Sequence, residues 1–591
     1  MIYPTLPVGN STRQMVDEFR GYNHNLRIGD GEFYEMENMS SDCYPVLAPR
    51  KPRRVVNQSN APNGMFYVLG CGLFVADGNF LFLQDDSGAV KTIFSDLEDC
   101  RKRFAMMGAF LIVTPDMRWI DTTDPEAAHT MGERWEVSSG SIKIELCDID
   151  GQVYENVTAS TEAPTSPGNL ELWLDTSVSG YGLKQYSAVS AEWVSVATTY
   201  LKISGLGDHY FETGDGVKIS GIDTSKNMRL YDVEGTHVIQ RSGHGDIVII
   251  GILDAAFTQE CTAEAPVILE REVPKLDFVV EAGNRLWGVI KGKNEIYASK
   301  LGDFKNWNVF QGIATDSWVG NVGTPGDFTG AINHGGYPIF YKEDVKHKVW
   351  PSSSGAHQIT TANCAGVQSG SGDSLAIVGG VLFYKSRDSI CMDDGSGPVD
   401  IGDVFGKASY SEAVAVAHRN KYYVCMTDDD RQRHLFVYDA KLGLWHCEDN
   451  WEFGAFASTG ESLYAGTVEG KYHGYLYDLD PESRLGEPEN YPVKWMVQTG
   501  DLGLSTPDRK YISRLTIRMA LNIGSEVSFY VQYDYDGIWV KLGTVYGSNL
   551  RTFSIPVRPR RCDNLRLKIC GTGYAKIFLI TKTIEEGSEL R

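Results

Sequence analysis

Short apolar runs separated by a glycine or a polar pair recur along the chain. Five copies lie within 277–478 and two more lie upstream, and the starts in the main array are 51, 46, 38 and 41 residues apart. A repeat of about 40–50 residues with several short strands is typical of a β-propeller blade. The copies are YVLGCGLFVADGNFLFL from Tyr67, AMMGAFLIVTP from Ala105, FVVEAGNRLWGVI from Phe278, TGAINHGGYPIFY from Thr329, LAIVGGVLFYKS from Leu375, AVAVAHRNKYYVCM from Ala413 and GAFASTGESLYAGT from Gly454.

One blade cannot bury both faces of its sheet, so blades must stack on their neighbours in a ring. The seven copies therefore predict a propeller of about seven blades. No long stretch has the period of an amphipathic helix, and the best helical candidate is the short segment Ser95–Met107. The predicted fold class is all-β and multi-domain, with a domain inserted in the propeller and a β-sandwich after it.

The repeat stops at Thr130 and resumes near Leu276, which indicates an inserted domain, because insertions into loops between strands cost little stability. Alternating residues in Thr198–Asp223 predict that this insert is a small β-barrel or sandwich. The run Tyr44–Val56 could supply the outer strand of the last blade. We expect an N-terminal arm with this closing strand at 1–65, first blades at 66–129, the insert at 130–270, further blades at 271–480 and a jelly-roll-like or immunoglobulin-like sandwich at 481–591.

Composition narrows the possible environments and partners. The formal charge is −22, so the chain as a whole repels nucleic acid, although DNA could still slide past it as cargo. The eleven cysteines have neither paired nor zinc-site spacing, which favours buried thiols in a reducing compartment. The N-terminal residues lack the apolar core of a signal peptide, and no run of 18 apolar residues predicts a membrane span.

Candidate chemistry is sparse, and we predict no catalytic residue, cofactor or metal. The cluster Asp428–Asp430 could bind a divalent cation, but a charged hairpin tip explains it better. His434, His446 and His473 each lack a recognisable partner nearby in sequence. A polysaccharide-degrading propeller would need a pair of carboxylates. Sialidase-like propellers repeat the box Ser-x-Asp-x-Gly-x-x-Trp, which SKLGDFKNW at Ser299–Trp307 resembles only faintly and only once.

Two basic clusters interrupt the acidic background. They are candidates for an interface between subunits or for a weak contact with phosphate, and the alternative is local pairing of solvated arginines. The first comprises Arg50, Lys51, Arg53 and Arg54, and the second comprises Arg558, Arg560 and Arg561.

Several stretches resemble bacteriophage tail proteins, most closely the β-propeller nozzle, or tail tubular protein B, of short-tailed phages. They are Gly21–Arg53, Asn284–Phe310, Thr315–Gly330 and Tyr511–Ser588, and the insert's ETGDGVKISG at Glu212–Gly221 is similar to small β-modules of virion proteins.

The resemblance implies a structural, non-enzymatic virion protein that forms a ring, hexameric in that family, in the phage tail. Such a ring would lie below the portal and adaptor, conduct DNA during ejection and support fibres or a tip. It would assemble in the host bacterial cytoplasm without spanning a membrane. The alternative functions are a polysaccharide-degrading or a receptor-binding propeller protein of a phage tail.

Overall fold

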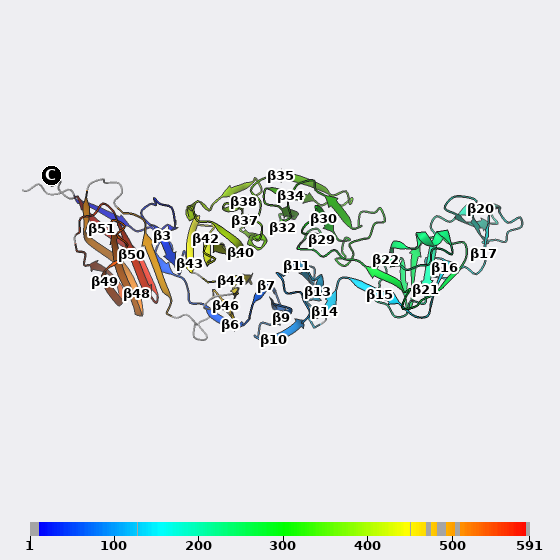
Figure 1. Cartoon of the computed structure of the whole chain (residues 1–591), viewed down its shortest axis with the longest axis horizontal. Coiled ribbons are helices and arrows are strands. Elements are labelled where there is room, and N and C mark those ends of the chain that lie inside the picture. The colour runs from blue at the N-terminus through cyan, green and yellow to red at the C-terminus, as the bar shows by residue number, and fades with distance from the viewer. Residues whose placement is uncertain are drawn as a thin grey trace, which may run out of the picture.

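The computed structural model describes residues 11–126, 128–449, 451–468, 474–480, 492–502, 509–558 and 560–586. Three β-modules lie in a row, with the propeller between the insert and the C-terminal module (Figure 1). Apart from three short 3-10 helices, η1 (Met228–Asp232), η2 (Gly372–Ser374) and η3 (Asp403–Phe405), the assigned elements of the described residues are strands. Ser95–Met107 is not helical, because Arg103–Met107 forms a strand of the propeller.

The propeller has seven four-stranded antiparallel blades, as the sequence repeat predicts. Each repeat copy supplies the inner strands of one blade. Its two apolar runs form the strands, and the glycine or polar pair between them forms the turn. Neighbouring blades pack through these inner strands, and β44 of the last blade meets β7 of the first. From the innermost strand outward, the first two blades are β7 (Pro62–Val68), β8 (Gly72–Asp77), β9 (Phe80–Gln84), β10 (Val90–Phe94), and β11 (Arg103–Met107), β12 (Phe110–Thr114), β13 (Arg118–Asp121), β14 (Ala128–Thr130).

The remaining five blades follow the insert and keep the same order of strands. They are β28 (Phe278–Glu281), β29 (Leu286–Val289), β30 (Glu295–Ala298), β31 (Trp318–Asn321); β32 (Gly330–His334), β33 (Tyr337–Tyr341), β34 (Val345–Trp350), β35 (Gln358–Asn363); β36 (Ala376–Val378), β37 (Val381–Lys385), β38 (Ile390–Asp393), β39 (Pro398–Asp400); β40 (Tyr410–His418), β41 (Lys421–Asp428), β42 (Arg433–Asp439), β43 (Leu444–Asp449); and β44 (Phe453–Ser458), β45 (Leu463–Thr467), β46 (Tyr475–Asp478) with β6 (Arg54–Gln58).

The last blade takes its outer strand from the other end of the chain. β6 pairs antiparallel with β46, with Gln58 opposite Tyr475 and Arg54 opposite Asp478. This strand overlaps the end of the run Tyr44–Val56 that the sequence analysis selected for the role. Pairing between the two ends of the propeller sequence closes the ring and leaves no blade with a missing strand.

The insert leaves the propeller after β14 and returns before β28 (Figure 1). Its apolar residues form one core between its sheets, including Ile144, Ile203 and Leu269. The sheets comprise β15 (Glu133–Val137), β27 (Val267–Arg271), β22 (Gly216–Ser220), β23 (Gly235–Val238); β24 (Arg241–Gly243), β25 (Asp246–Ile250), β21 (Tyr200–Ser204), β16 (Ser141–Cys147), β26 (Phe257–Glu260); and β17 (Val157–Ser160), β18 (Leu172–Asp175), β19 (Gly182–Ser187), β20 (Glu192–Ser195).

A buried polar joint fixes the insert to the third blade. Arg271 Nη1 donates to Asp215 Oδ2 at 2.6 Å, and Asn306 Nδ2 donates to Asp215 Oδ1 at 2.9 Å. The Asn306 side chain also accepts a bond from the backbone N–H of Gly216 at 2.9 Å. All three side chains are buried, so the joint is shielded from solvent and holds one relative orientation of the two modules.

The C-terminal module is a sheet that folds over itself and encloses a core. Its long strand β48 (Lys510–Tyr533) pairs along one edge with β49 (Val540–Ile555). Along the other edge, its first half pairs with β51 (Ala575–Glu586) and its second half with β50 (Leu565–Thr572). One hairpin therefore contributes to both layers of a sandwich.

N-terminal strands complete this sandwich, so residues before the closing strand are more than an arm. The sheet order is β1-β51-β48-β50-β47-β3-β2, with β1 (Ser11–Val16), β2 (Gly21–Tyr22), β3 (Glu32–Glu37) and β47 (Lys494–Thr499). A small ribbon of β4 (Met39–Ser40) and β5 (Ala48–Pro49) leads on to β6. The first and last parts of the chain thus share one module, which the division at 1–65 and 481–591 did not anticipate.

Removing the carboxylate of the insert joint is expected to loosen the insert. Asp215→Ala leaves the Arg271 guanidinium buried without its carboxylate, which should cost about 3 kcal/mol or more in unfolding free energy. Urea unfolding and the rate of limited proteolysis at the joint measure the effect. Asp223→Ala, an exposed carboxylate of the same module, is the matched control; equal behaviour of the two variants would contradict the assignment.

Candidate functional site

The central channel of the propeller is the candidate functional site. It is a cavity of about 490 Å³ to which all seven blades contribute. Most of the lining residues are apolar, because the innermost strand of each blade is apolar on both faces and lies next to the axis. One representative from each blade is Met65, Phe104, Val280, Ile332, Leu375, Val414 and Phe456.

Three charged side chains cross this channel and form one cluster. Arg103 holds Asp373 through two bonds, Nε to Oδ1 at 3.0 Å and Nη2 to Oδ2 at 3.2 Å. Arg101 Nε lies 2.9 Å from Asp373 Oδ2. A guanidinium bound to both oxygens of a carboxylate is a strong and directional contact. Asp373 is therefore fully engaged by its two cations.

Backbone and ring contacts extend the cluster to further blades. Arg101 Nη1 donates to the carbonyl of Gly454 in β44, and Arg103 Nη1 donates to the carbonyl of Asp277 at 3.1 Å. The Arg103 guanidinium carbon also lies 4.1 Å from the centre of the Phe278 ring. The cluster thus links the second, third, fifth and seventh blades across the axis.

The backbone next to Asp373 approaches its neighbours too closely for a side chain. A Cβ added at Gly372 would lie 2.5 Å from the carbonyl oxygen of Thr329 and 2.6 Å from Phe278 Cε1. Glycine at this position therefore allows η2 to bring Asp373 to the two arginines.

The electrostatics of the cluster favour a fixed negative charge over proton transfer. Burial alone would raise the pKa of Asp373, but the Arg101 and Arg103 guanidiniums outweigh it and hold that pKa below its usual value. A general acid at neutral pH needs the opposite shift. The arrangement is suited to bracing blades against one another.

Sequence reasoning overlooked this cluster. The available signal for the cluster was the basic triplet Arg101, Lys102 and Arg103, which lies at the start of an innermost strand. The Asp373 partner is far away in sequence and only the ring topology brings it to the axis. Lys102 is buried, points elsewhere and pairs with Asp116.

The first basic cluster of the sequence analysis lies in the wall of the propeller. Arg53 is fully buried, donates to Glu448 Oε2 at 2.7 Å, and lies 4.4 Å from the centre of the Trp451 ring. Arg50 is also buried and donates to Asn38 Oδ1 at 2.6 Å. Their assignment as contacts with a neighbour or with DNA is therefore wrong, because neither side chain reaches the surface of the chain.

The other basic candidates lie nearer to solvent. Lys51 pairs with Asp480, and Arg54 lies 3.5 Å from Asp478, so both reinforce the closing blade. Arg560 pairs with Asp536 at 3.2 Å, whereas Arg558 and Arg561 are exposed. The structure brings the first cluster together around the closure and places the second on the C-terminal module.

The acidic tip has a local partner in His434, and His446 is buried. Asp428 Oδ2 lies 2.8 Å from His434 Nε2 at the end of the β41–β42 hairpin. Burial lowers the pKa of His446 to about 4. His473 lies outside the described residues. Within the described residues, no group of three or more carboxylate, histidine or cysteine side chains has the geometry to hold a metal.

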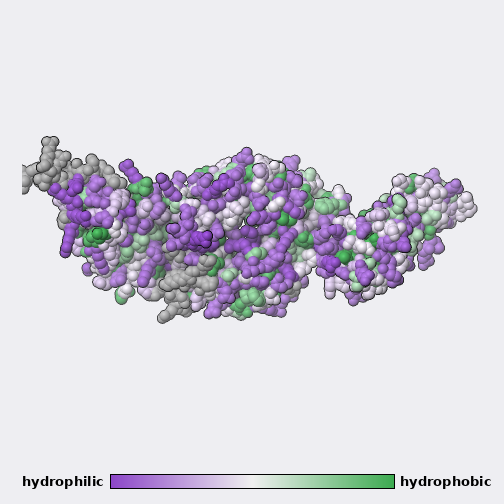
Figure 2. Space-filling model, in the orientation of Figure 1, coloured by the Kyte–Doolittle hydropathy of each residue, from purple (hydrophilic) through white to green (hydrophobic). Residues whose placement is uncertain are grey.

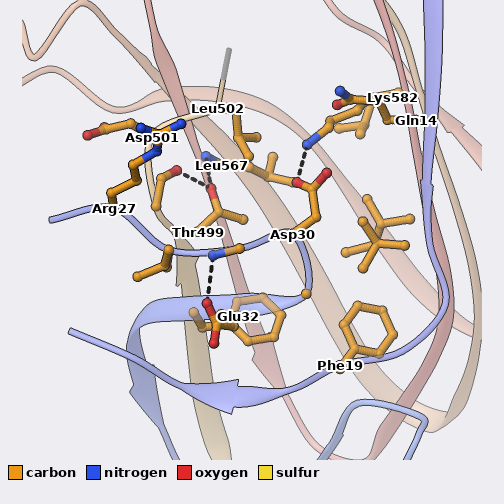
Figure 3. A pocket seen from close by; sticks show the side chains of 18 of the residues that line it. Gln14, Phe19, Arg27, Asp30, Glu32, Thr499, Asp501, Leu502, Leu567 and Lys582 are labelled. Carbon is orange, nitrogen blue, oxygen red and sulfur yellow. Dashed lines mark hydrogen bonds and ion pairs between the residues drawn. The ribbon is translucent and has the colours of Figure 1, made fainter. Parts of the chain in front are cut away.

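A second cavity, of about 220 Å³, lies in the C-terminal module beside the Gly29–Gly31 turn. Figure 3 shows Lys582 directed at Asp30, with Nζ 2.7 Å from Oδ1. The Glu32 carboxylate accepts a bond from the backbone N–H of Gly29 at 2.6 Å. The Lys582–Asp30 bond fastens the N-terminal turn to β51, and the Glu32–Gly29 bond closes the turn itself.

The comparisons with known proteins give little further information. No family model and no curated protein matches the sequence. Solved structures with partial similarity include U3-55K (8% identity, 72% of this chain and 98% of that chain, TM-score 0.33), a mitotic checkpoint complex (10%, 73% and 95%, 0.32) and PorZ from Porphyromonas gingivalis (10%, 90% and 82%, 0.25). These scores are too low to support an argument about function.

All eleven cysteines are free thiols, and six of them are buried. None of the helices among the described residues has the length and apolar character that crossing a bilayer requires.

The channel cluster predicts a pH-dependent contribution to stability. The pKa of Asp373 is lowered in the folded state. Its contribution to the free energy of unfolding is therefore complete above the unfolded-state pKa of about 3.9 and is lost as the pH falls through the folded-state pKa. Asp373→Asn should therefore lose about 1–2 kcal/mol at pH 7, and the difference from wild type should shrink below pH 4. Urea unfolding across this range measures it. The exposed Asp344→Asn should change little, and a difference for Asp373→Asn that stays constant to pH 3 would contradict the argument.

The buried arginine of the closure predicts a large and specific effect. Arg53→Met leaves the buried Glu448 carboxylate without its closest cation and should reduce the unfolding free energy by about 3–5 kcal/mol. Chemical denaturation measures this. Arg561→Met, at an exposed member of the other basic cluster, should lie within about 0.5 kcal/mol of wild type. A similar small loss for both variants would mean that Arg53 is not structural.

Proposed function

We propose that the chain is a structural protein of a bacteriophage tail, which assembles into a hexameric ring and serves as a nozzle-like conduit for DNA ejection. The same ring would act as a platform for fibres or a tip. The observation that supports this most is the arrangement of the modules: a propeller with one β-module on each side forms an elongated chain (Figure 2).

The two ends differ in charge. Residues 493–591 contain 15 lysines and arginines against 9 acidic residues, and residues 11–49, which belong to the same module, contain 3 against 7, so this end has a net charge of +2. The insert, residues 131–272, contains 9 against 22, a net charge of −13, and the rest of the chain, with −11, completes the total of −22. An elongated subunit with one weakly basic and one strongly acidic end is suited to a fixed place between two different neighbours.

The channel supports a mechanical role over carbohydrate cleavage. A glycosidase needs two carboxylates about 5–10 Å apart, one of them with a raised pKa. The carboxylate at the blade junction, Asp373, has a lowered pKa and is bound by two arginines. A braced propeller resists deformation, which is what a wall around moving DNA requires.

The proposal also defines the expected partners and location. Portal and adaptor proteins would contact one end of the ring, and fibre or tip proteins the other. DNA would pass as cargo that the acidic surface repels and therefore does not bind. Assembly in the bacterial cytoplasm fits the eleven free thiols, since that compartment keeps cysteines reduced. The mature location would be the tail of the virion.

Purified full-length protein is expected to form closed rings with a central opening. Sedimentation velocity gives the mass, and negative-stain images give the symmetry and the width of the lumen. A six-fold ring supports the nozzle. A chain that stays monomeric over the whole accessible concentration range, and releases sugar from host capsule or cell wall, would contradict it and favour the enzyme alternative.

A further inference from the structure

Among the described residues, β49 is an edge strand of the C-terminal module. It pairs with β48 along one side, and no other strand of the described residues pairs with its second side. The strand runs for 16 residues, Val540–Ile555, and contains no proline. An open edge of this length presents a row of backbone donors and acceptors to another chain, and proteins usually shorten or cover such edges.

A bulge beside this edge exposes apolar side chains. Between the pairs Leu521–Ser548 and Glu526–Tyr546, β48 has four residues where β49 has one. Ile523 lies within this bulge and is 97% exposed. On the facing strand, Tyr546 is 67% and Leu550 is 52% exposed. Large apolar side chains at this exposure, next to an open strand edge, are typical of a surface that becomes buried by a partner.

Cations outnumber carboxylates along this hairpin: one exposed carboxylate, Glu526, lies opposite Tyr546 in register, and three cations lie on the same two strands. β49 contains Lys541 and Arg551 and no acidic residue, and Arg518 of β48 is paired in register with Thr552. All three side chains are exposed, and none forms an ion pair with a described residue. The edge is therefore positive on a chain whose residues 1–492 have a net charge of −28.

We propose that the β49 edge, with Ile523, Tyr546 and Leu550, docks onto a different, acidic surface of a second copy of this chain. This inference rests on the proposed ring and specifies the side of the subunit that makes the contact. Complementary charge would orient the approaching copy, and apolar burial with strand pairing would hold it. Such a contact joins unlike surfaces, so repetition does not end at a dimer, and a rotation that closes on itself gives the proposed ring.

Pairing of two β49 strands with each other is disfavoured. In the antiparallel register that brings the two Tyr546 residues together, Lys541 of each copy lies opposite Arg551 of the other. Like charges directly opposite one another destabilise a strand pair. A parallel arrangement would place the same cations side by side.

Nucleic acid is the less favoured occupant of this edge. Phosphate contacts use cations, whereas this surface also exposes aliphatic side chains and an unpaired strand edge, which a DNA backbone does not satisfy. The acidic remainder of the chain is a partner of sufficient charge and is present at the same concentration.

Two substitutions at exposed positions test the docking surface without disturbing the core. In full-length protein, Ile523→Asp combined with Tyr546→Asp should raise the concentration for half-assembly at least tenfold by sedimentation velocity. Val189→Asp, which alters a fully exposed valine of the insert, should stay within twofold of wild type. Thermal unfolding and circular dichroism confirm that each variant is folded.

A photo-cross-linking residue in place of Tyr546 identifies the occupant. The expected product links two copies through an acidic segment outside β49, in the presence or absence of duplex DNA. A link between two β49 strands, or a link to duplex DNA alone, would overturn the proposal. If the wild type forms rings and the double variant assembles equally well, this inference is overturned and the proposed nozzle function is unaffected. If the wild type is monomeric, both are overturned.

Discussion

Closing a ring of separate sheets is the constraint on which the rest of the structure depends. The seventh blade lacks its outer strand until β6 arrives from the N-terminal part of the chain and pairs with β46. Beside that strand, Arg53 lies between Glu448 of the sixth blade and the Trp451 ring that precedes the seventh. Strand pairing and a buried ion pair thus act at one place. Contacts between such distant parts of a sequence form late, because the loop they close must first lose its entropy.

Paired charge, buried or half-buried, recurs where two parts of the molecule must keep one orientation. Asp215 accepts bonds from Arg271 of the insert and Asn306 of the propeller, and Asp373 accepts two bonds from Arg103 and forms an ion pair with Arg101 across the channel. A buried ion pair adds little stability compared with apolar packing, because both charges lose their water. Its value lies in geometry, since only one arrangement satisfies all the polar atoms. Apolar blades with polar joints explain how a chain with so many short strands keeps one shape.

Apolar periodicity made most of the fold predictable, and topology made the rest hard to predict. The runs at Phe278 and Gly454 correspond to the inner strands β28–β29 and β44–β45, because an inner strand must be apolar on both faces. The periodicity does not reveal which strands pair over long distances, so the N-terminal strands of the C-terminal sandwich were missed. Likewise, Arg53 looked like a surface cation in sequence, and only its pairing with Glu448 places it inside. Glu212–Gly221, noted for its similarity to virion β-modules, and Ser299–Trp307, noted as a faint match to the sialidase box, meet in the insert joint through Asp215 and Asn306.

The path of the chain at the insert has a consequence for how this molecule could diversify. The two strands that enter and leave the insert lie side by side, with Arg271 Nε donating to the backbone carbonyl of Met131 at 3.0 Å. A segment whose ends are adjacent behaves as a cassette: it can be exchanged for another of different length or surface while the flanking blades stay in register. Related chains could therefore carry unrelated inserted domains on the same propeller, and bind a different external partner while the propeller stays the same.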